Sequence, residues 1–417
     1  MDRPCLLSIN NYYYRRGGAE VVFLEHNRIF QEAGWYVAPF AMQHPNNLRT
    51  QWQDFFVEEI EFNRAYGVIQ SARRAGRIIY SLEAREKLHS LLNIVKPQIA
   101  HVHNIYHHIS PSVLGLLKES GVPTVMTAHD LKLACPAYRM LANDEICERC
   151  KGGRIHNVAL RRCIKNSLAV SALVMIETFV HRTLGLYRDT LDRVVVPSRF
   201  YIDKFVEWGW PRERFAHVPN FVDVRQFSAN RDIGEAFVFA GRLSPEKGAE
   251  VLLRAAAASR RPLLIAGEGP QEEKLRALAN RLSADVRFLG RLGRLDLIRL
   301  IHSARAVVLP SLWYENAPMG ILEAYALGRP VIGSRIGGVP ELVRDEQTGA
   351  TFAAGDIDEL ADTMRRWAAM PKARVAEMGA NGREWVEREF SEARYLTRIS
   401  DLYASLLKEK AQQALPT

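Results

Sequence analysis

Two carboxylates in the second half of the chain lie where the sequence predicts a loop followed by a helix. Glu315 and Glu323 belong to the segment 309–341, LPSLWYENAPMGILEAYALGRPVIGSRIGGVPE. Asn316 is a candidate N-cap and Pro318 an early helix residue, so the eight-residue spacing places both carboxylates on nearly the same side. The free N–H groups of such a helix start favour a phosphate, beside which the carboxylates could hold sugar and ribose hydroxyl groups. The alternative is a pair of charges on a solvated helix face.

Two cations stand on another expected strand-to-helix loop, FAGRLSPEKG at 239–248. Arg242 and Lys247 are five positions apart in this loop. The planar fork of an arginine and the point charge of a lysine together suit a diphosphate leaving group. Standing alone, the pair would be ordinary loop cations. The carboxylate segment that follows favours the diphosphate interpretation.

The first half of the chain offers glycines and histidines at the ends of expected strands. Gly17 and Gly18 precede a helix and permit close backbone approach to a phosphate or sugar, without forming the G-x-G-x-x-G pattern of dinucleotide-binding proteins. His129 follows VPTVMTA at the carboxyl end of a strand, where α/β sheets place ligands, although a lone histidine there is often only a structural loop residue. His103 ends another strand, and we expect it near the cleft on the acceptor side.

Four cysteines fall within a basic, loop-like segment at 135–163. Their spacing is C-x11-C-x2-C-x12-C, formed by Cys135, Cys147, Cys150 and Cys163. Four thiolates could bind a structural zinc ion tetrahedrally. Only one C-x-x-C pair is present, however, so free reduced thiols are an equally good interpretation.

Two further patterns have a structural alternative. Asp356 and Asp358 spell D-x-D but open an expected helix, where aspartate is a normal capping residue. The apolar stretch 167–180, SLAVSALVMIETFV, follows the basic run RRCIKN and is too short to span a bilayer. It fits either a buried helix or a helix in peripheral contact with a membrane.

Short apolar runs alternate with helical patterns along the chain, which is typical of parallel α/β architecture. The expected strands are 5–9, 36–40, 98–102, 124–127 and 193–196, then 236–240, 263–266, 286–289, 306–309 and 330–333. The turn-rich segment 218–234 separates the two sets. We therefore predict two Rossmann-like, doubly wound domains facing a cleft, at 1–217 and 235–390, and a last helical segment, 391–417, that crosses back to the first domain.

Charge and composition restrict the partners. The chain has 417 residues, of which 47% are hydrophobic and 25% charged, as in ordinary globular proteins. Residues 1–230 carry 29 Lys and Arg against 22 Asp and Glu, which accounts for +7 of the net charge of +9. This excess suits a membrane surface or a lipid pyrophosphate, and without a dense basic run it argues against nucleic acid. The N-terminus lacks a signal-peptide layout, so we expect a cytoplasmic protein that could work at the inner face of the membrane.

These motifs resemble glycosyltransferase family 4, whose members have the GT-B fold. The resemblance rests on GGAE, VPSRF, VPNFVD, GRLSPEKG, AGEGP, FLG and the E-x7-E pair, which follow the family's order over most of the chain. It implies a retaining hexosyltransferase that needs no metal or other cofactor for catalysis. The donor would be a nucleotide diphosphate sugar, UDP- or GDP-linked, and the acceptor a saccharide or lipid-linked saccharide of a surface polysaccharide or other glycoconjugate.

The resemblance also implies a role for each motif. Arg242 and Lys247 would hold the diphosphate, Glu315 and His129 would contact the donor sugar, and Glu323 the ribose. Further donor contacts would come from Gly17 and Gly18, from Gly290 and Arg291 near the base, and from backbone groups of Met319, Gly320, Ile321 and Leu322. Three alternatives remain. They are a sugar-nucleotide epimerase of the same fold, a non-catalytic sugar- or nucleotide-binding relative, and a nucleic-acid-binding protein that would use the charge alone and lose affinity steeply with salt.

Overall fold

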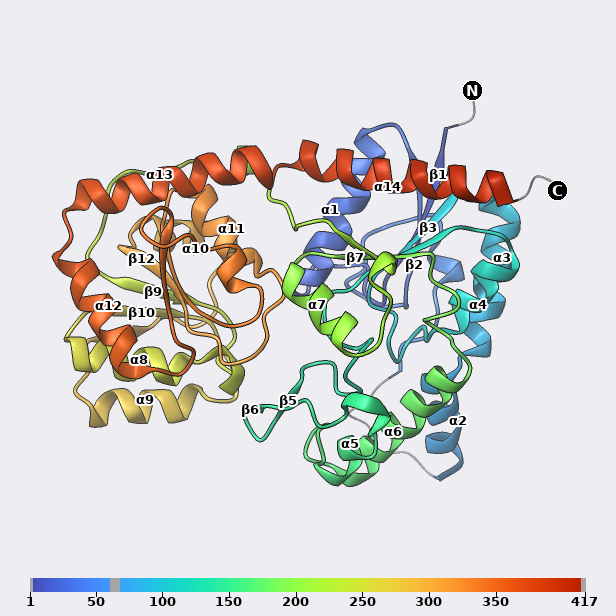
Figure 1. Cartoon of the computed structure of the whole chain (residues 1–417), viewed down its shortest axis with the longest axis horizontal. Helices are drawn as coiled ribbons and strands as arrows, with labels where there is room; N and C mark the ends of the chain where they lie inside the picture. Colours follow the sequence, from blue (N-terminus) through green and yellow to red (C-terminus); the bar gives the residue numbers. More distant parts are fainter. Residues whose placement is uncertain (1–2, 61–67, 414–417) are drawn as a thin grey trace.

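The computed structural model describes residues 3–60 and 68–413. Two separate parallel sheets of six strands each lie side by side, with strand orders β2-β1-β3-β4-β7-β8 and β11-β10-β9-β12-β13-β14 (Figure 1). Most residues of these strands are buried, and most of the buried ones are apolar, because helices cover both faces of an open parallel sheet. The predicted α/β class with two Rossmann-like domains is confirmed.

The N-terminal domain contains the first sheet. Its strands are β1 (Cys5–Ile9), β2 (Tyr36–Phe40), β3 (Ile99–Val102), β4 (Thr124–Thr127), β7 (Arg193–Val196) and β8 (Phe215–His217). The helices between them are α1 (Gly18–Glu32), α2 (Val68–Ile79), α3 (Leu82–Val95), α4 (Ser112–Glu119) and α7 (Arg199–Glu207), with short 3-10 turns η1 (Gln53–Phe55) and η3 (Arg212–Arg214). An excursion after β4 forms the lower end of this domain in Figure 1. It consists of the hairpin β5 (Leu141–Ala142) and β6 (Glu145–Ile146), η2 (Lys151–Gly153), α5 (Asn157–Leu160) and α6 (Leu168–Thr183).

The C-terminal domain contains the second sheet. Its strands are β9 (Phe237–Ala240), β10 (Leu263–Ala266), β11 (Val286–Phe288), β12 (Ala306–Leu309), β13 (Val331–Ser334) and β14 (Gly349–Phe352). Its helices are α8 (Ala249–Ser259), α9 (Glu272–Arg281), α10 (Arg294–His302), α11 (Met319–Ala326), α12 (Ile357–Ala369) and α13 (Lys372–Glu389), with η5 (Pro245–Lys247) and η6 (Val339–Glu341). The Asp356 side chain caps α12 by accepting the N–H of Glu359 at 2.9 Å, which confirms its capping role.

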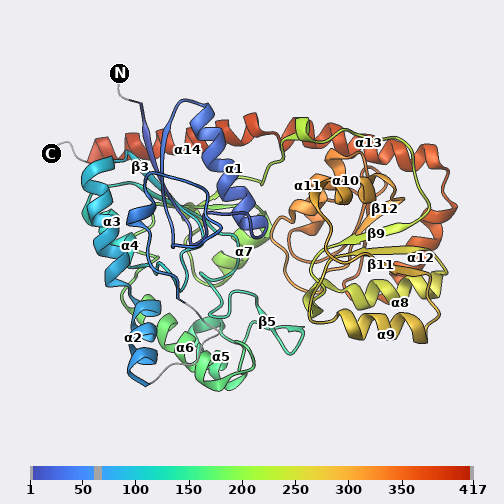
Figure 2. The same cartoon turned by 180° about the vertical axis from the view of Figure 1, so that it is seen from behind.

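The last helix, α14 (Glu392–Gln413), leaves the second domain and lies along the first, as Figures 1 and 2 both show. Tyr395, Ile399 and Tyr403 are buried in one cluster with Leu6 and Phe30 of the N-terminal domain. Their spacing of four residues puts them on a single face of the helix. The C-terminal segment is therefore part of the core of the first domain.

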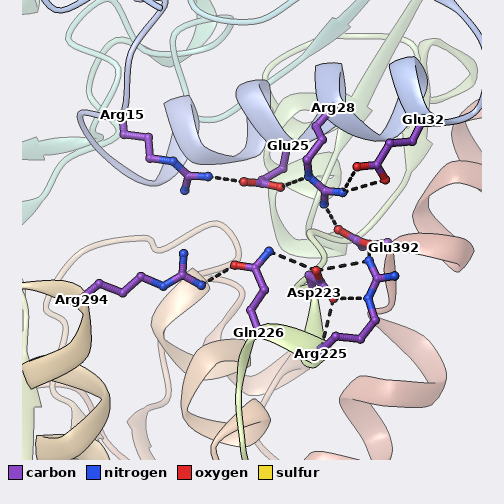
Figure 3. A network of polar contacts seen from close by, with 9 residues as sticks. All are labelled: Arg15, Glu25, Arg28, Glu32, Asp223, Arg225, Gln226, Arg294 and Glu392. Carbon is purple, nitrogen blue, oxygen red and sulfur yellow. Dashed lines mark hydrogen bonds and ion pairs between the residues drawn. The ribbon is translucent and has the colours of Figure 1, made fainter.

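A network of charged and polar side chains ties the two domains together beside the linker (Figure 3). It joins α1, the start of α10, the start of α14 and η4 (Val224–Gln226). Arg225 lies at its centre, with Nη2 2.6 Å from Glu392 and Nε 2.8 Å from Asp223. Glu392 also pairs with Arg28 of α1, and Arg294 donates to Gln226. Because these partners come from both domains and the linker, they hold one relative orientation of the sheets.

Candidate active site

A cavity of about 540 Å³ opens between the domains at the carboxyl ends of their strands. Ligands of open α/β sheets bind at such edges. The lining includes seven residues expected from the sequence, namely Gly18, His129, Lys247, Glu315, Met319, Gly320 and Glu323. Tertiary structure thus brings both domains' motifs to one cavity.

Lys247 and Glu315 form an ion pair inside this cavity. The lysine Nζ lies 2.7 Å from Oε1 of Glu315, and the Ser311 hydroxyl donates to the same oxygen at 2.7 Å. The lysine also lies over the Trp313 ring, 5.1 Å from its centre. Gly248 makes this placement possible, because it has a φ of 69° and a Cβ there would come within 1.8 Å of the Pro310 carbonyl oxygen. An anion entering the cavity would meet a cation that is already oriented.

The helix α11 directs its N-terminus into the same cavity. It begins at Met319, so the first N–H groups, those of Met319 and Gly320, have no partner within the helix. The N–H of Ile321 donates to the Pro318 carbonyl at 3.1 Å, and Leu322 is buried in the core beneath. Of the four residues expected to face a phosphate, 319–322, only Met319 and Gly320 therefore offer a free backbone N–H to the cavity. Leu322 serves packing, because it lies on the inner face of the helix.

The expected N-cap of α11 at Asn316 is wrong. Pro318 holds the N-cap position, and no side chain caps the helix. The Asn316 side chain instead reaches the other domain, where its Oδ1 accepts from Ser198 at 2.8 Å and its Nδ2 donates to the Ala128 carbonyl at 3.0 Å. Nearby, the Glu341 carboxylate accepts the first two N–H groups of α7 at 2.9 and 2.8 Å. Local sequence cannot reveal such cross-domain partners.

A second, smaller cavity of about 230 Å³ adjoins the first in the C-terminal domain. Its wall is mostly apolar and includes Gly241, Gly267, Arg291 and Ile321. Glu323 lines both cavities. A mostly apolar space beside a helix N-terminus would suit a nucleobase, and Glu323, which lines both cavities, lies where a ribose would join them. Burial raises the pKa of the Glu323 carboxyl, and the charge of Arg294 opposes this shift.

Arg242 and Gly17, the first glycine of the N-terminal loop, lie near the two cavities but do not line them. Arg242 is exposed and does not line either cavity, although Gly241 and Lys247 beside it do. Gly17 is the N-cap of α1 and precedes the lining residue Gly18. Gly290 has a φ of 64°, and its carbonyl accepts the N–H of Gly267 at 2.7 Å. Gly290 therefore shapes the base-side loop that presents Arg291.

His103 does not reach the cleft, which corrects its expected place on the acceptor side. It is completely buried, and its Nδ1 lies 2.8 Å from Nε2 of His129. His103 and His129 follow the ends of the neighbouring strands β3 and β4, so their rings stack with centres 5.1 Å apart. Burial lowers the pKa of both, that of His129 to about 4, so both imidazoles are neutral near pH 7. His103 thus orients His129, whose ring lines the cavity.

Sequence reasoning overlooked three residues of the cavity wall, namely Asp130, Trp313 and Tyr201. Burial raises the pKa of Asp130 to about 6, against the opposing effects of the Lys132 N–H and its charge. Asp130 could have been noticed beside His129 at a strand end. Trp313 directly precedes the Tyr314–Glu315 pair, whereas Tyr201 reaches the site only through folding.

The four cysteines gather around Cys150. Burial and the three other thiols nearby raise the pKa of Cys150 to about 12, and all four are free thiols. Among the described residues, no three of their sulfur atoms lie within 4.8 Å of one another. Sulfur atoms around a tetrahedral zinc ion are about 3.8 Å apart, given Zn–S bonds of about 2.3 Å. The cluster is thus wider than a zinc site requires, and structural zinc stays a prediction that a metal assay of the purified protein tests.

The cysteine segment supports the loop that carries Glu315. Glu148, which lies between Cys147 and Cys150, accepts from the Tyr314 hydroxyl at 3.0 Å and pairs with Lys204 at 2.9 Å. The Tyr314 backbone carbonyl in turn accepts from the Tyr201 hydroxyl at 2.9 Å. The segment therefore holds the Glu315 loop in place through contacts outside the cavity. No motif in the sequence indicates these contacts.

Removing the Glu148 contact with Tyr314 should weaken donor binding more than it slows turnover. We expect Glu148→Gln to raise the KM for the donor about threefold to tenfold with a smaller change in kcat, because a charge-assisted bond to Tyr314 is lost outside the reacting centre. Steady-state kinetics measure both terms. Glu145→Gln, an exposed change in the same cysteine segment, is the control. An unchanged KM in Glu148→Gln would show that the contact between Glu148 and Tyr314 does not contribute to donor binding.

Comparison with known proteins agrees with this geometry. A cleft between two Rossmann-like domains, with a helix N-terminus and a cation facing it, defines the GT-B class. A family model described as "Glycosyltransferase Family 4" matches residues 16–226, and one described as "Glycosyl transferases group 1" matches residues 223–385. The chain belongs to glycosyltransferase family 4, as its motifs led us to expect.

Similar proteins with known roles include two actinobacterial enzymes. A GDP-mannose-dependent monoacylated alpha-(1-6)-phosphatidylinositol monomannoside mannosyltransferase of Corynebacterium glutamicum is 34% identical over 235 residues, which cover 50% of this chain and 60% of that protein. A D-inositol 3-phosphate glycosyltransferase of Saccharomonospora viridis is 36% identical over 183 residues, 40% of this chain and 41% of that protein. The matches thus span less than two thirds of these relatives.

Solved structures extend the likeness to the whole fold. Sucrose-phosphate synthase from Thermosynechococcus elongatus superposes with a TM-score of 0.72 at 20% identity, covering 98% of this chain and all of that one. Anabaena HepE in complex with UDP and glucose gives a TM-score of 0.68 at 14% identity, covering 97% and 100%. At these identities the likeness establishes the GT-B fold alone.

Proposed function

We propose that this protein is a retaining glycosyltransferase that moves a hexose from a nucleotide diphosphate sugar to a saccharide or lipid-linked acceptor. The observation that carries the proposal is the Lys247–Glu315 pair beside the free N-terminus of α11, in a cavity between two domains. A cation and helix N–H groups stabilise a diphosphate, and the adjoining apolar cavity accepts a base. A sugar-nucleotide epimerase would share the donor site, but it would have no need for an acceptor side.

In this mechanism the bond between the anomeric carbon and the diphosphate oxygen breaks, and a bond to the acceptor oxygen forms. Lys247 and the N–H groups of Met319 and Gly320 stabilise the charge that develops on the leaving diphosphate. Glu315 and the neutral His129 orient the sugar hydroxyl groups. The acceptor attacks from the leaving-group side, and its proton passes to the departing diphosphate oxygen. No protein group needs to change its protonation state.

We further propose that the enzyme works at an anionic membrane surface, in surface polysaccharide or glycoconjugate synthesis. Leu168, Ile176 and Phe179 share one outward face of α6 and are 55%, 48% and 61% exposed. Residues 151–188 contain seven Lys or Arg and one acidic residue, Glu177, which is buried. No described helix is long and apolar enough to cross a bilayer. Sedimentation with anionic vesicles, lost in Phe179→Asp but kept in the C-terminal control Leu295→Asp, tests this contact.

The donor class can be measured by calorimetric titration with UDP, GDP, ADP and their common sugar conjugates. We expect one base series to bind in the micromolar range, and the matching sugar conjugate to be consumed when acceptor is supplied. Glu323→Gln should weaken the binding of that series about tenfold, because it removes a charge-assisted contact to the ribose. If no nucleotide binds to the folded protein, the transferase assignment is wrong.

A further inference from the structure

A third cavity, of about 230 Å³, lies within the N-terminal domain, away from the cleft. It is enclosed by Lys132, by the end of α6 with the turn that follows it, and by residues 208–210 after α7. None of its lining residues belongs to the interdomain cavity. The transfer reaction therefore does not account for it.

Three residues that line this cavity each have a buried polar side-chain atom without a hydrogen-bond partner in the described part of the chain. These atoms are Oγ1 of Thr178, the hydroxyl of Tyr187 and the indole Nε1 of Trp208. The neighbouring Trp210 provides a contrast, because its Nε1 donates to the Leu133 carbonyl at 3.1 Å. Buried polar groups are almost always paired, so three unpaired ones around one cavity point to a missing partner.

The unpaired groups and the charges of the wall specify the chemistry of that partner. An indole N–H can only donate, and the two hydroxyl groups can donate as well. Arg182 and Arg188 add two cations to the wall, whereas the Lys132 ammonium is neutralised by Glu177 at 2.9 Å. Neither Glu177 nor the nearby Asp189 lines the cavity. A partner with several acceptor oxygens and a negative charge fits this set of donors.

We propose that this cavity binds a phosphate group, held by the Thr178, Tyr187 and Trp208 donors and by the two arginines. The site lies beyond the proposed donor diphosphate site. The phosphate could belong to a free phosphomonoester or to the headgroup of a lipid. The second source has a structural basis, because Phe179 and Leu184, 61% and 59% exposed, flank the site on α6 and its end.

Thermal unfolding with and without inorganic phosphate tests the site. Without phosphate, Thr178→Val and Tyr187→Phe should melt at the wild-type temperature or higher, because each removes a buried unpaired group. With phosphate, the wild type should melt several degrees higher, and both variants should lose most of that shift. Lys247→Ala, which alters the cleft, should keep it. Loss of the shift in Lys247→Ala, or its persistence in both cavity variants, would overturn the proposal.

Fluorescence gives a second, independent readout. The measurement uses a Lys247→Ala background, which weakens phosphate binding in the cleft beside Trp313. In that background phosphate should change the emission of the parent and of Trp210→Phe but not of Trp208→Phe, because of the two indoles in the wall of this cavity the Trp208 indole is the one left unpaired among the described residues. Glycerol 1-phosphate and vesicles containing phosphatidic acid, with phosphatidylcholine vesicles as the control, separate the sources. A response to the soluble phosphates assigns a free ligand, and a Tyr187-dependent response to the acidic vesicles alone assigns a headgroup. No response to any of these probes means that water fills the cavity, and the proposal fails.

Discussion

Replacing Lys247 with alanine should lower kcat about 100- to 1,000-fold, with a smaller effect on nucleotide affinity. The ion pair with Glu315, at 2.7 Å, fixes the position of the lysine in the cavity, so its charge needs little reorganisation when the diphosphate begins to leave. Preoriented charges of this kind act mainly on the transition state. Transfer rates measured at saturating donor and acceptor give the effect directly. Arg242→Ala should also slow turnover, if this exposed side chain turns toward the diphosphate when donor binds.

Two controls separate catalysis from structural damage. Lys274→Ala removes an exposed lysine of the same domain, which pairs with Glu250 at 2.8 Å, and should leave the rate unchanged. Lys247→Ala also leaves the buried Glu315 without its ion-pair partner, so its melting temperature must be measured together with its rate. The double variant Lys247→Ala, Glu315→Gln removes that unpaired charge. Near-normal turnover in both Lys247→Ala and Arg242→Ala would exclude a role of these cations at the diphosphate.

Acidification from pH 7 to pH 5 should strongly destabilise the N-terminal domain. His26, His101, His103 and His129 form one buried group, held by the Tyr395 and Tyr403 hydroxyls of α14 and by Thr127 of β4. Burial lowers all four pKa values, that of His26 to about 3 and that of His129 to about 4. In the unfolded chain these imidazoles take up protons near pH 6.5. In the folded protein His129 takes one up only near pH 4 and His26 only near pH 3, and the pKa values of His101 and His103 also lie well below 6.5.

This difference favours the unfolded state by about 2 kcal/mol for each histidine at pH 5. The penalty is absent above about pH 6.5, where the imidazoles are neutral in both states, and it grows as the pH falls toward the folded-state pKa values. Asp130 acts in the opposite direction, because its raised pKa, about 6, lets the folded state gain a proton in this range. One carboxyl cannot offset four imidazoles, so the net free energy of unfolding falls.

Denaturant unfolding at several pH values measures the effect. The slope of the free energy of unfolding against pH gives the number of protons taken up on unfolding. This number should fall by about one in His26→Phe and stay unchanged in His89→Gln, an exposed change on α3. Should His26→Phe fail to fold, NMR titration of the wild-type imidazoles supplies the same information. Resonances assigned to His26, His101, His103 or His129 that titrate near pH 6.5 would contradict the buried, neutral group.

Local sequence determined the family, the fold class and most of the residues of the proposed donor site. Apolar runs of four or five residues between glycines and prolines locate the strands, because a strand covered on both faces needs little else. Lys247, Glu315, Met319 and Gly320 could be named in advance because each stands at a strand-to-helix junction, where chain direction alone brings it to the sheet edge. The edge strands β8 and β14 escaped prediction because their sequences, FAH and GATF, contain no continuous apolar run of four residues.

Tertiary structure decided the features that depend on partners distant along the chain. Asn316 leaves its capping position for Ser198, His103 turns inward to His129, and Glu148 reaches Tyr314, 166 positions away. The histidine group is closed by tyrosines of α14, and the phosphate cavity joins α6 to the end of α7. Spacing in sequence predicts which face of an element a side chain occupies, but only the packing of that face against another element decides what the side chain meets.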